Sequence, residues 1–180
     1  MADWPGESVG RTLITAAELQ KRVSALAEAI TADLADHDPL VLGVLNGAFI
    51  FTADLVRSLR FPLEVAFVGA SSYGQGQRSS GHVEIAGLAG ERISGRHVLV
   101  VEDVVDTGHT LNRLLEMLRS QSPVSLRVCA LLDKRAARQV PVQIDYVGFE
   151  VPDQFVVGYG LDSAQRFRNL ACVALSLEQE

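Results

Sequence analysis

Residues 98–111, VLVVEDVVDTGHTL, join four consecutive apolar residues directly to acidic ones. Two adjacent acids, Glu102 and Asp103, follow the apolar run, and Asp106 comes three residues later. Like charges repel, and a carboxylate beside a hydrophobic core is costly unless something pairs with it. The chain thus places three acids where its most hydrophobic strand is predicted to end, and a bound partner would compensate their cost.

Apolar residues at helical and strand spacings flank this stretch on both sides. Thr15-x-x-Glu18 forms a capping box, and it is followed at helical spacing by Leu19, Val23, Leu26, Ile30 and Leu34. This pattern predicts a helix that ends near residues 37–39. Further helices are predicted at residues 48–59 and 107–120. Strands are predicted at residues 40–45, 63–69, 97–102, 124–132, 145–149 and 155–159.

Strands that alternate with helices predict an α/β fold with a parallel sheet covered on both faces. Such sheets bind ligands just outside the carboxyl ends of their strands. The acids at 102–106 lie at that kind of edge, and so does the sharp turn Asn46-Gly47 after the strand at 40–45. We therefore expect the two loops to face one pocket.

Composition limits the class of protein. With 180 residues, 48% of them hydrophobic, the chain is expected to fold as one domain around a substantial core. A formal charge of −6 disfavours nonspecific nucleic-acid binding but allows a local cationic pocket for an anionic metabolite. No apolar run approaches the length of a membrane span, and the polar start lacks the regions of a signal peptide. We expect no membrane partner and a cytoplasmic location.

The two cysteines, Cys129 and Cys172, are too few for a disulfide framework and lack the spacing of metal ligands. Cys129 lies within an apolar run, so we expect a buried thiol.

Residues 106–110, DTGHT, form a short turn that enters the predicted helix. Threonine hydroxyls, a glycine that permits close backbone approach, and unsatisfied amides at a helix N-terminus together suit a phosphate group. The structural alternative is a helix N-cap formed by Asp106 or Thr107, and this pentapeptide alone does not decide between the two.

The pair Glu102–Asp103 adds a second feature. Two acids at the end of a buried strand are expensive unless they meet a cation, a metal or a hydroxyl-rich ligand. A sugar diol or a hydrated Mg²⁺ ion would satisfy them, although solvated loop acids are the alternative. The acid pair at 102–103, the two residues that follow it and the turn at 106–110 together indicate a binding site for a ribose phosphate.

Four further residues indicate little when each is taken alone. Lys134 follows a predicted strand and either projects over the same edge or is an ordinary solvated lysine. Asp162 and Arg168 lie near the C-terminus, where charged residues normally face water. Phe155 is by default a core residue beside Val156, and otherwise a stacking platform for a ligand.

With these residues assembled, about residues 41–170 resemble a 6-oxopurine phosphoribosyltransferase of the hypoxanthine–guanine type. The stretch at 98–111 is similar to that family's signature for 5-phosphoribosyl-1-diphosphate (PRPP). Other similar segments are LNGAFIFTADL, SSYGQGQRSSGHVEI, LLDKR and DYVGFEVPDQFVVGYGLDSAQRFRNL. The PRPP signature alone indicates only the superfamily, whereas the C-terminal segment is specific to the purine enzymes.

The resemblance implies a role for each candidate residue. Asp106 would be catalytic, as the general base or proton carrier at purine nitrogen 7. The ribose phosphate of PRPP would be held by Glu102, Asp103, Thr107, Gly108, His109 and Thr110. The pyrophosphate would be held by Asn46, Gly47 and Arg168. The purine would be held by the Lys134 ammonium on its 6-oxo group, by stacking on Phe155 and by the Val156 backbone. The implied cofactor is Mg²⁺, with Glu102, Asp103 and Asp162 as its ligands.

The resemblance also implies a type I phosphoribosyltransferase fold, which is a Rossmann-like parallel sheet flanked by helices. Its core would span about residues 37–150, and a small hood would come from about 1–15 and 150–180. The terminal segment ACVALSLEQE would return as a strand near the N-terminus. A mobile lid would span about residues 70–85, with Ser72 and Tyr73 at its tip. A homodimer or homotetramer is expected.

Two positions depart from the family pattern. Asn46-Gly47 stands where Lys-Gly or Arg-Gly is common, so this turn would offer backbone amides across a strained or cis peptide, without a side-chain cation. His109 stands where lysine is common, and binding by the main chain survives that change.

The reaction implied is transfer of phosphoribosyl from PRPP to hypoxanthine or guanine, giving IMP or GMP and pyrophosphate, in purine salvage. A PRPP-sensing regulatory protein that binds RNA or DNA is an alternative. It would need a basic face, and the chain has 16 Lys plus Arg against 22 acids, with no basic cluster. A phosphoribosyltransferase acting on xanthine or a pyrimidine is a third reading, and Lys134 suits any oxo group.

Overall fold

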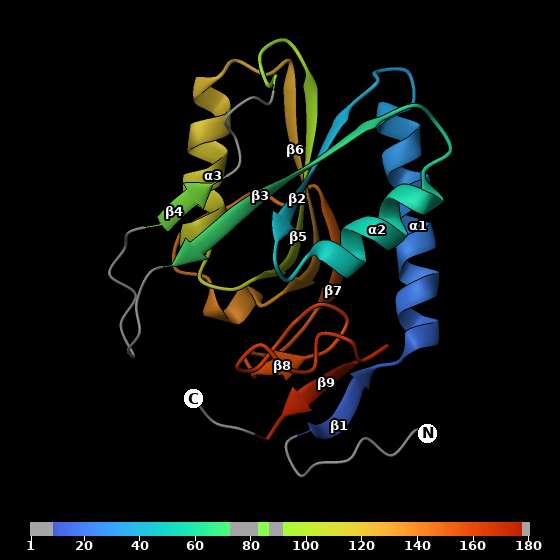
Figure 1. Ribbon diagram of the computed structural model, residues 1–180, viewed down its shortest axis with the longest axis vertical. Helices are drawn as coiled ribbons and strands as arrows, with labels where there is room; N and C mark the ends of the chain where they lie inside the picture. The colour runs from blue at the N-terminus through green and yellow to red at the C-terminus, as the bar shows by residue number, and fades with distance from the viewer. Residues whose placement is uncertain (1–8, 73–82, 87–91, 178–180) are drawn as a thin grey trace.

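The computed structural model describes residues 9–72, 83–86 and 92–177. A main sheet occupies the centre of the molecule (Figure 1), with the strand order β4-β3-β2-β5-β6-β7. Its strands are β2 (Leu40–Leu45), β3 (Glu64–Ser72), β4 (Val83–Ala86), β5 (His97–Val105), β6 (Ser125–Asp133) and β7 (Tyr146–Glu150). Neighbouring strands from β3 to β7 are parallel, and β4 is antiparallel to β3. The predicted α/β fold with a parallel sheet is confirmed.

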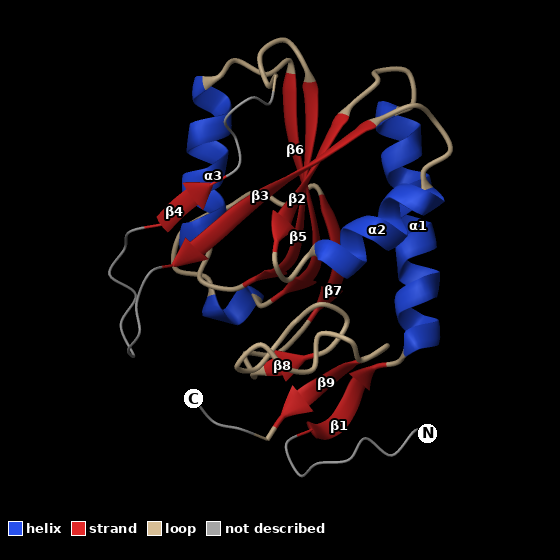
Figure 2. Cartoon of the chain, in the orientation of Figure 1, coloured by secondary structure: helices blue, strands red, loops and turns tan. Residues whose placement is uncertain are grey.

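Helices cover both faces of this sheet (Figure 2). The helices α1 (Ala16–Leu34) and α2 (Phe49–Ser58) lie on one face, and α3 (His109–Ser120) lies on the other. In β5, Leu99 and Val101 belong to the core beneath α1 and α2, while Val98 and Val100 belong to the core beneath α3. Successive strand residues point to opposite faces, so a strand that is buried on both faces needs an unbroken apolar run.

The N-terminus of α1 is fixed by the predicted capping box. The Thr15 hydroxyl accepts from the Glu18 amide at 3.3 Å, and the Glu18 carboxylate accepts from the Thr15 amide at 2.8 Å. These two bonds satisfy amides that the first helical turn leaves without partners. The predicted core positions are all buried: Leu19, Val23, Leu26, Ile30 and Leu34.

A second, three-stranded sheet joins the two ends of the chain. Its order is β1-β9-β8, formed by β1 (Val9–Ile14), β8 (Val156–Val157) and β9 (Val173–Ser176), all antiparallel. The expected return of the C-terminal segment as a strand beside the N-terminus is confirmed. This small sheet lies beyond the carboxyl ends of the parallel strands (Figure 1), and it faces the edge where the candidate residues gather.

Several predicted boundaries were wrong, three of them beside the candidate residues. The strand at 97–102 continues to Val105, because its last residues pair with the end of β6, and Glu102 and Asp103 therefore lie inside the strand. The helix predicted from residue 107 begins at His109, after Gly108 in the left-handed region. The strand at 155–159 shrinks to two residues, since the backbone turns to positive φ directly after Val157.

Part of the expected lid lies within the described residues. The backbones of Ser72 and Val83 pair at the end of the β3–β4 ribbon, while Tyr73 and the residues at 73–82 and 87–91 lie outside the described part of the chain. Cys129 is buried, and both cysteines are free. No helix in the described ranges has the length and apolarity needed to span a membrane.

Candidate active site

In the acid pair near the end of β5, Glu102 is buried and Asp103 is half-buried. Glu102 is 7% exposed. Its burial and the neighbouring Asp103 charge raise the pKa of the Glu102 carboxyl well above its usual range. Burial also raises the pKa of Asp103, while the charge of Arg168 acts in the opposite direction. It is costly for both carboxyl groups to carry a charge at the same time. A cation or a hydroxyl-rich ligand bound between them would stabilise the charged forms.

The turn at Asn46–Gly47 lies directly against this acid pair. It follows β2, and the peptide bond between Leu45 and Asn46 is cis, as expected for this turn. A Cβ atom on Gly47 would collide with the Asp103 carboxylate, so glycine alone allows this approach. The two loops expected to face one pocket do meet at the edge of the sheet.

The turn at 106–110 surrounds a small cavity of about 150 Å³. Gly108 is the N-cap residue of α3, and no side chain caps the helix, so the alternative of an N-cap by Asp106 or Thr107 is excluded. Among the hydrogen bonds between described residues, the amides at 107–110 donate none. Free amides at a helix N-terminus form an anion site. The cavity is lined by Glu102, Val104, Val105, Asp106, Thr107, Gly108, Thr110 and Leu111.

His109 lies away from this cavity. Its side chain is exposed, and its Nε2 atom is 3.3 Å from Gln139 Oε1. The imidazole therefore contributes nothing to the cavity wall, and only the His109 amide remains available to an anion there.

Lys134 is buried at the same edge rather than solvated. Its residue is 7% exposed, and its Nζ atom lies 3.4 Å from Asp106 Oδ2 and 3.9 Å from Asp153 Oδ1. A cation so placed beside a half-exposed carboxylate can donate to a ligand oxygen that enters between them. The structure thus joins Lys134 to the turn that carries Asp106.

Phe155 and Val156 start the segment that enters the small sheet. Val156 is buried in β8, whereas Phe155 is 37% exposed, so the default expectation of a core phenylalanine was wrong. A partly exposed aromatic side chain is available to stack on a planar ligand.

Asp162 and Arg168 form an ion pair in the loop between β8 and β9. The distance from Arg168 Nη2 to Asp162 Oδ1 is 2.7 Å, and Arg168 Nη1 donates to the Gly160 carbonyl at 2.8 Å. The other Asp162 oxygen accepts from the Gln165 amide at 2.8 Å. This cation is therefore held in place before any ligand arrives.

Comparison with known proteins identifies the family. The model of the phosphoribosyl transferase domain matches residues 10–164. The chain belongs to the phosphoribosyltransferase family. It is 42% identical over 167 residues to the hypoxanthine-guanine phosphoribosyltransferase of Bacillus subtilis, covering 93% of each chain. It is 44% identical over 160 residues to the hypoxanthine phosphoribosyltransferase of Escherichia coli, covering 88% of this chain and 90% of that one.

Solved structures of the family share the fold. A structure of Trypanosoma cruzi hypoxanthine phosphoribosyl transferase superposes with a TM-score of 0.88 at 38% identity, covering 96% of this chain and 94% of that one. A Staphylococcus aureus hypoxanthine phosphoribosyltransferase superposes with a TM-score of 0.89 at 34% identity, covering 94% and 92%. The Rossmann-like sheet with flanking helices is therefore the type I phosphoribosyltransferase fold.

The acid pair of this phosphoribosyltransferase fits a magnesium ion. Mg²⁺ is commonly bound through one or two carboxylates together with substrate oxygens and water. In the described ranges, no group of three or more His, Cys, Asp or Glu side chains forms a complete metal cage. Two neighbouring carboxyl groups with raised pKa values, beside the cavity at the turn 106–110, suit an ion of this kind.

Sequence reasoning missed three residues at the edge that the structure brings forward. Asp153 lies beside Lys134, and the buried pair Asp133–Arg138 lies behind the turn at 106–108. The acid at the end of β6, next to Lys134, repeats the arrangement at the end of β5 and could have been noticed. Nothing in the sequence showed that Arg138 turns back towards β5.

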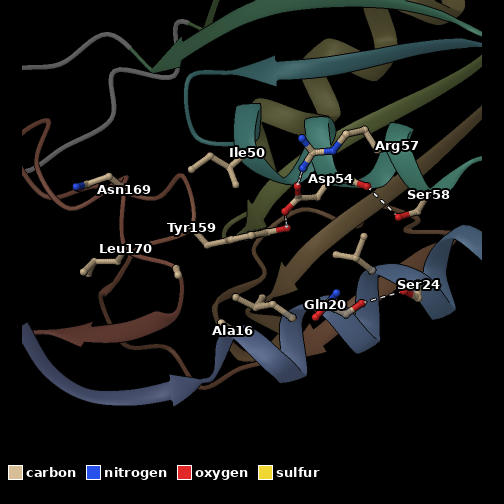
Figure 3. Close-up of a pocket in the computed structure, with 13 residues that line it drawn as sticks. Ala16, Gln20, Ser24, Ile50, Asp54, Arg57, Ser58, Tyr159, Asn169 and Leu170 are labelled. Carbon is tan, nitrogen blue, oxygen red and sulfur yellow. Dashed lines mark hydrogen bonds and ion pairs between the residues drawn. The ribbon is translucent and has the colours of Figure 1, made fainter. Parts of the chain in front are cut away.

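A second hollow of about 500 Å³ lies away from these residues, between α1, α2 and the loop after β8 (Figure 3). There the Tyr159 hydroxyl donates to Asp54 at 2.6 Å, and Asp54 also pairs with Arg57. None of the predicted site residues lines it. This groove is therefore separate from the cavity at the turn 106–110, with which it shares no lining residue.

Proposed function

We propose that this phosphoribosyltransferase transfers the phosphoribosyl group of PRPP to hypoxanthine or guanine, giving IMP or GMP and pyrophosphate in purine salvage. The observation that carries the proposal is Lys134, buried and 3.4 Å from Asp106 beside the phosphate turn. A fixed ammonium there would donate to the 6-oxo group of a purine whose imidazole nitrogens reach Asp106. The names of the relatives support the same substrates.

The reaction makes one bond and breaks another at the anomeric carbon. The purine nitrogen bonds to that carbon, pyrophosphate leaves with the electron pair of the broken bond, and the imidazole proton passes to Asp106. Free amides at 107–110 hold the 5′-phosphate, while Phe155 and the Val156 backbone hold the base. Acid–base assistance of this kind contributes roughly 10²- to 10⁴-fold in rate.

Pyrophosphate is held by the Asn46–Gly47 backbone and Arg168 in this proposal. Arg168 is positioned by Asp162 and the Gly160 carbonyl, so its cation is preorganised for an anion that gains charge as it leaves. Mg²⁺ would be held by Glu102 and Asp103 on the ribose side and by Asp162 on the pyrophosphate side. When bound, it would neutralise charge on the leaving group.

The domain organisation that accompanies this function has three parts. One domain spans 1–180, with a core at about 37–150, a hood from about 1–15 and 150–180, and a lid at about 70–85. The lid, including Ser72 and Tyr73, would close over the reacting atoms and exclude water. Slower hydrogen exchange at Ser72 and Val83 with PRPP and a purine analogue bound would support closure, and unchanged exchange would count against it.

The proposed enzyme works in the cytoplasm as a homodimer or homotetramer, with no nucleic-acid partner. Large apolar side chains on α2 and β3 are 40% or more exposed and support self-association: Phe49, Val65 and Phe67. Light scattering of the purified protein measures the oligomer directly, and a monomer at micromolar concentration would contradict this part of the proposal.

A substrate panel tests the proposed function. Purified protein with PRPP and Mg²⁺ is given hypoxanthine, guanine, xanthine or adenine, and nucleotide is measured by chromatography. We expect IMP and GMP, and no AMP. Xanthine belongs in the panel because Lys134 suits any oxo group. If nucleotide forms from xanthine alone, the substrate is xanthine and not hypoxanthine or guanine. Folded protein that forms no nucleotide from any of these bases would refute an enzymatic role.

A further inference from the structure

The peptide groups of the phosphate turn are held from behind by the segment that follows β6. The Asp106 carbonyl accepts from Arg138 Nε at 2.9 Å. The Val105 carbonyl accepts from Arg138 Nη2 at 3.2 Å and from the Lys134 amide at 3.0 Å. The Thr107 carbonyl accepts from the amides of residues 139 and 140 at 3.0 and 3.1 Å. Three consecutive carbonyls are therefore fixed.

Gly108 allows this segment to approach. A Cβ on Gly108 would lie 2.9 Å from Arg138 Cδ and 2.9 Å from the Val140 carbonyl oxygen, and the residue has φ of 89°. A larger residue would be strained by its backbone conformation and would push the segment away. The glycine of the phosphate turn thus serves the packing behind the turn as well as the ligand in front of it.

Arg138 is itself fixed by Asp133. The two side chains form an ion pair in which Arg138 is 15% exposed and Asp133 is 10% exposed. The guanidinium therefore contacts one carboxylate and two main-chain carbonyls at once, an arrangement that uses the planar fork of arginine. An ion pair so well enclosed is costly to break from one side, because the remaining charge stays buried.

We propose that Arg138, anchored by Asp133, is a positioning residue that aims the amides of the phosphate turn at the 5′-phosphate. A trans peptide group is planar, so its N–H points opposite to its carbonyl. Arg138 holds the Asp106 carbonyl from behind and so turns the Thr107 amide towards the cavity. The amides of residues 139 and 140, which follow Arg138, hold the Thr107 carbonyl and so turn the Gly108 amide the same way. Arg138 does not line that cavity, so it acts through the backbone and not on the ligand. The inference rests on the proposed function.

Steady-state kinetics of Arg138→Ala, with Arg135→Ala as the matched control, test the proposal. Arg135 lies in the same turn, but its side chain is 79% exposed and pairs with Glu150 on the surface. We expect Arg138→Ala to raise KM for PRPP about tenfold or more, the size expected from losing a charge-assisted hydrogen bond. KM for hypoxanthine should stay near the wild-type value, and methylguanidinium added to the assay should restore part of the PRPP affinity.

The control and the milder variants make the result decisive. Arg135→Ala should match the wild type in both KM values. If Arg138→Ala does not fold, Arg138→Lys tests the proposal in its place. The lysine ammonium keeps the ion pair with Asp133 but cannot reach both main-chain carbonyls, so KM for PRPP should still rise. Equal rises in both KM values, unchanged kinetics or no rescue would overturn the positioning role. An inactive wild type would instead refute the proposed function.

Discussion

At the scale of single residues, Asp106 carries the proton in the proposed reaction. Asp106→Asn keeps the size of the side chain and removes its basicity, so we expect kcat to fall by about 10²- to 10⁴-fold. KM for PRPP should change little, since the amides of the phosphate turn remain. Initial rates with saturating hypoxanthine measure the effect, and a variant with the kcat of the wild type would exclude a proton-transfer role.

Lys134 determines the choice of base in this proposal. Lys134→Gln removes the ammonium beside Asp106 and should raise KM for hypoxanthine about tenfold or more, as expected for a lost charged hydrogen bond. Lys21→Gln is the control, because Lys21 is the other lysine of the chain and lies exposed on α1. If both variants bind hypoxanthine equally well, Lys134 does not contact the base.

Glu102 should make the ligand-free protein less stable as pH rises. Its pKa in the folded chain lies above the ordinary value of 4.5 because of burial and the Asp103 charge, so the folded chain binds this proton more tightly than the unfolded chain. The free energy of unfolding therefore falls as pH increases from about 4.5 through the folded pKa. Glu102→Gln removes this loss and should be more stable than the wild type at neutral pH.

Urea denaturation of both proteins without Mg²⁺, at several pH values, checks this expectation. The stability difference between Glu102→Gln and the wild type should shrink as pH falls towards 4.5. A difference that does not vary with pH would mean that the Glu102 carboxyl is not perturbed by its surroundings.

At the scale of elements, the capping box of α1 makes a separate prediction about stability. Thr15→Ala removes the side-chain bond to the Glu18 amide and should lower the free energy of unfolding by about 1 kcal/mol. Ser24→Ala is the matched control, because the Ser24 hydroxyl donates to the Gln20 carbonyl within α1 on an exposed helix face and caps no helix end. Thermal unfolding should separate the two variants, and equal melting temperatures would contradict the role of the cap.

Periodicity predicted β2, β3, β5, β6 and β7 of the main sheet, because each has an apolar pattern and a recognisable turn, but it did not predict β4. It failed at the ends of β5 and α3, where tertiary contacts decide the boundary. Pairing with Leu132 and Asp133 extends β5 past the acids, and the left-handed Gly108 delays α3. These are the residues of the phosphate turn, so the local rules were least accurate at the site itself.

At the scale of the whole molecule, the small sheet depends on contacts that no local pattern contains. β1 and β9 pair across almost the full length of the chain, and β8 has two residues. Resemblance to a family, and not periodicity, predicted the return of the C-terminal segment. In the same way, sequence placed the acids, Lys134 and the Asn46–Gly47 turn at one edge, but only the folded chain showed that Arg138 reaches behind the turn.

Transfer of phosphoribosyl to a purine is the central activity proposed for this chain, and one measurement tests it directly. Purified protein is incubated with PRPP, Mg²⁺ and hypoxanthine, and IMP and pyrophosphate are both quantified over time. We predict that the two products form in equal amounts and that neither forms when hypoxanthine is left out. Folded protein that forms no IMP, or releases pyrophosphate without a purine, would contradict the account.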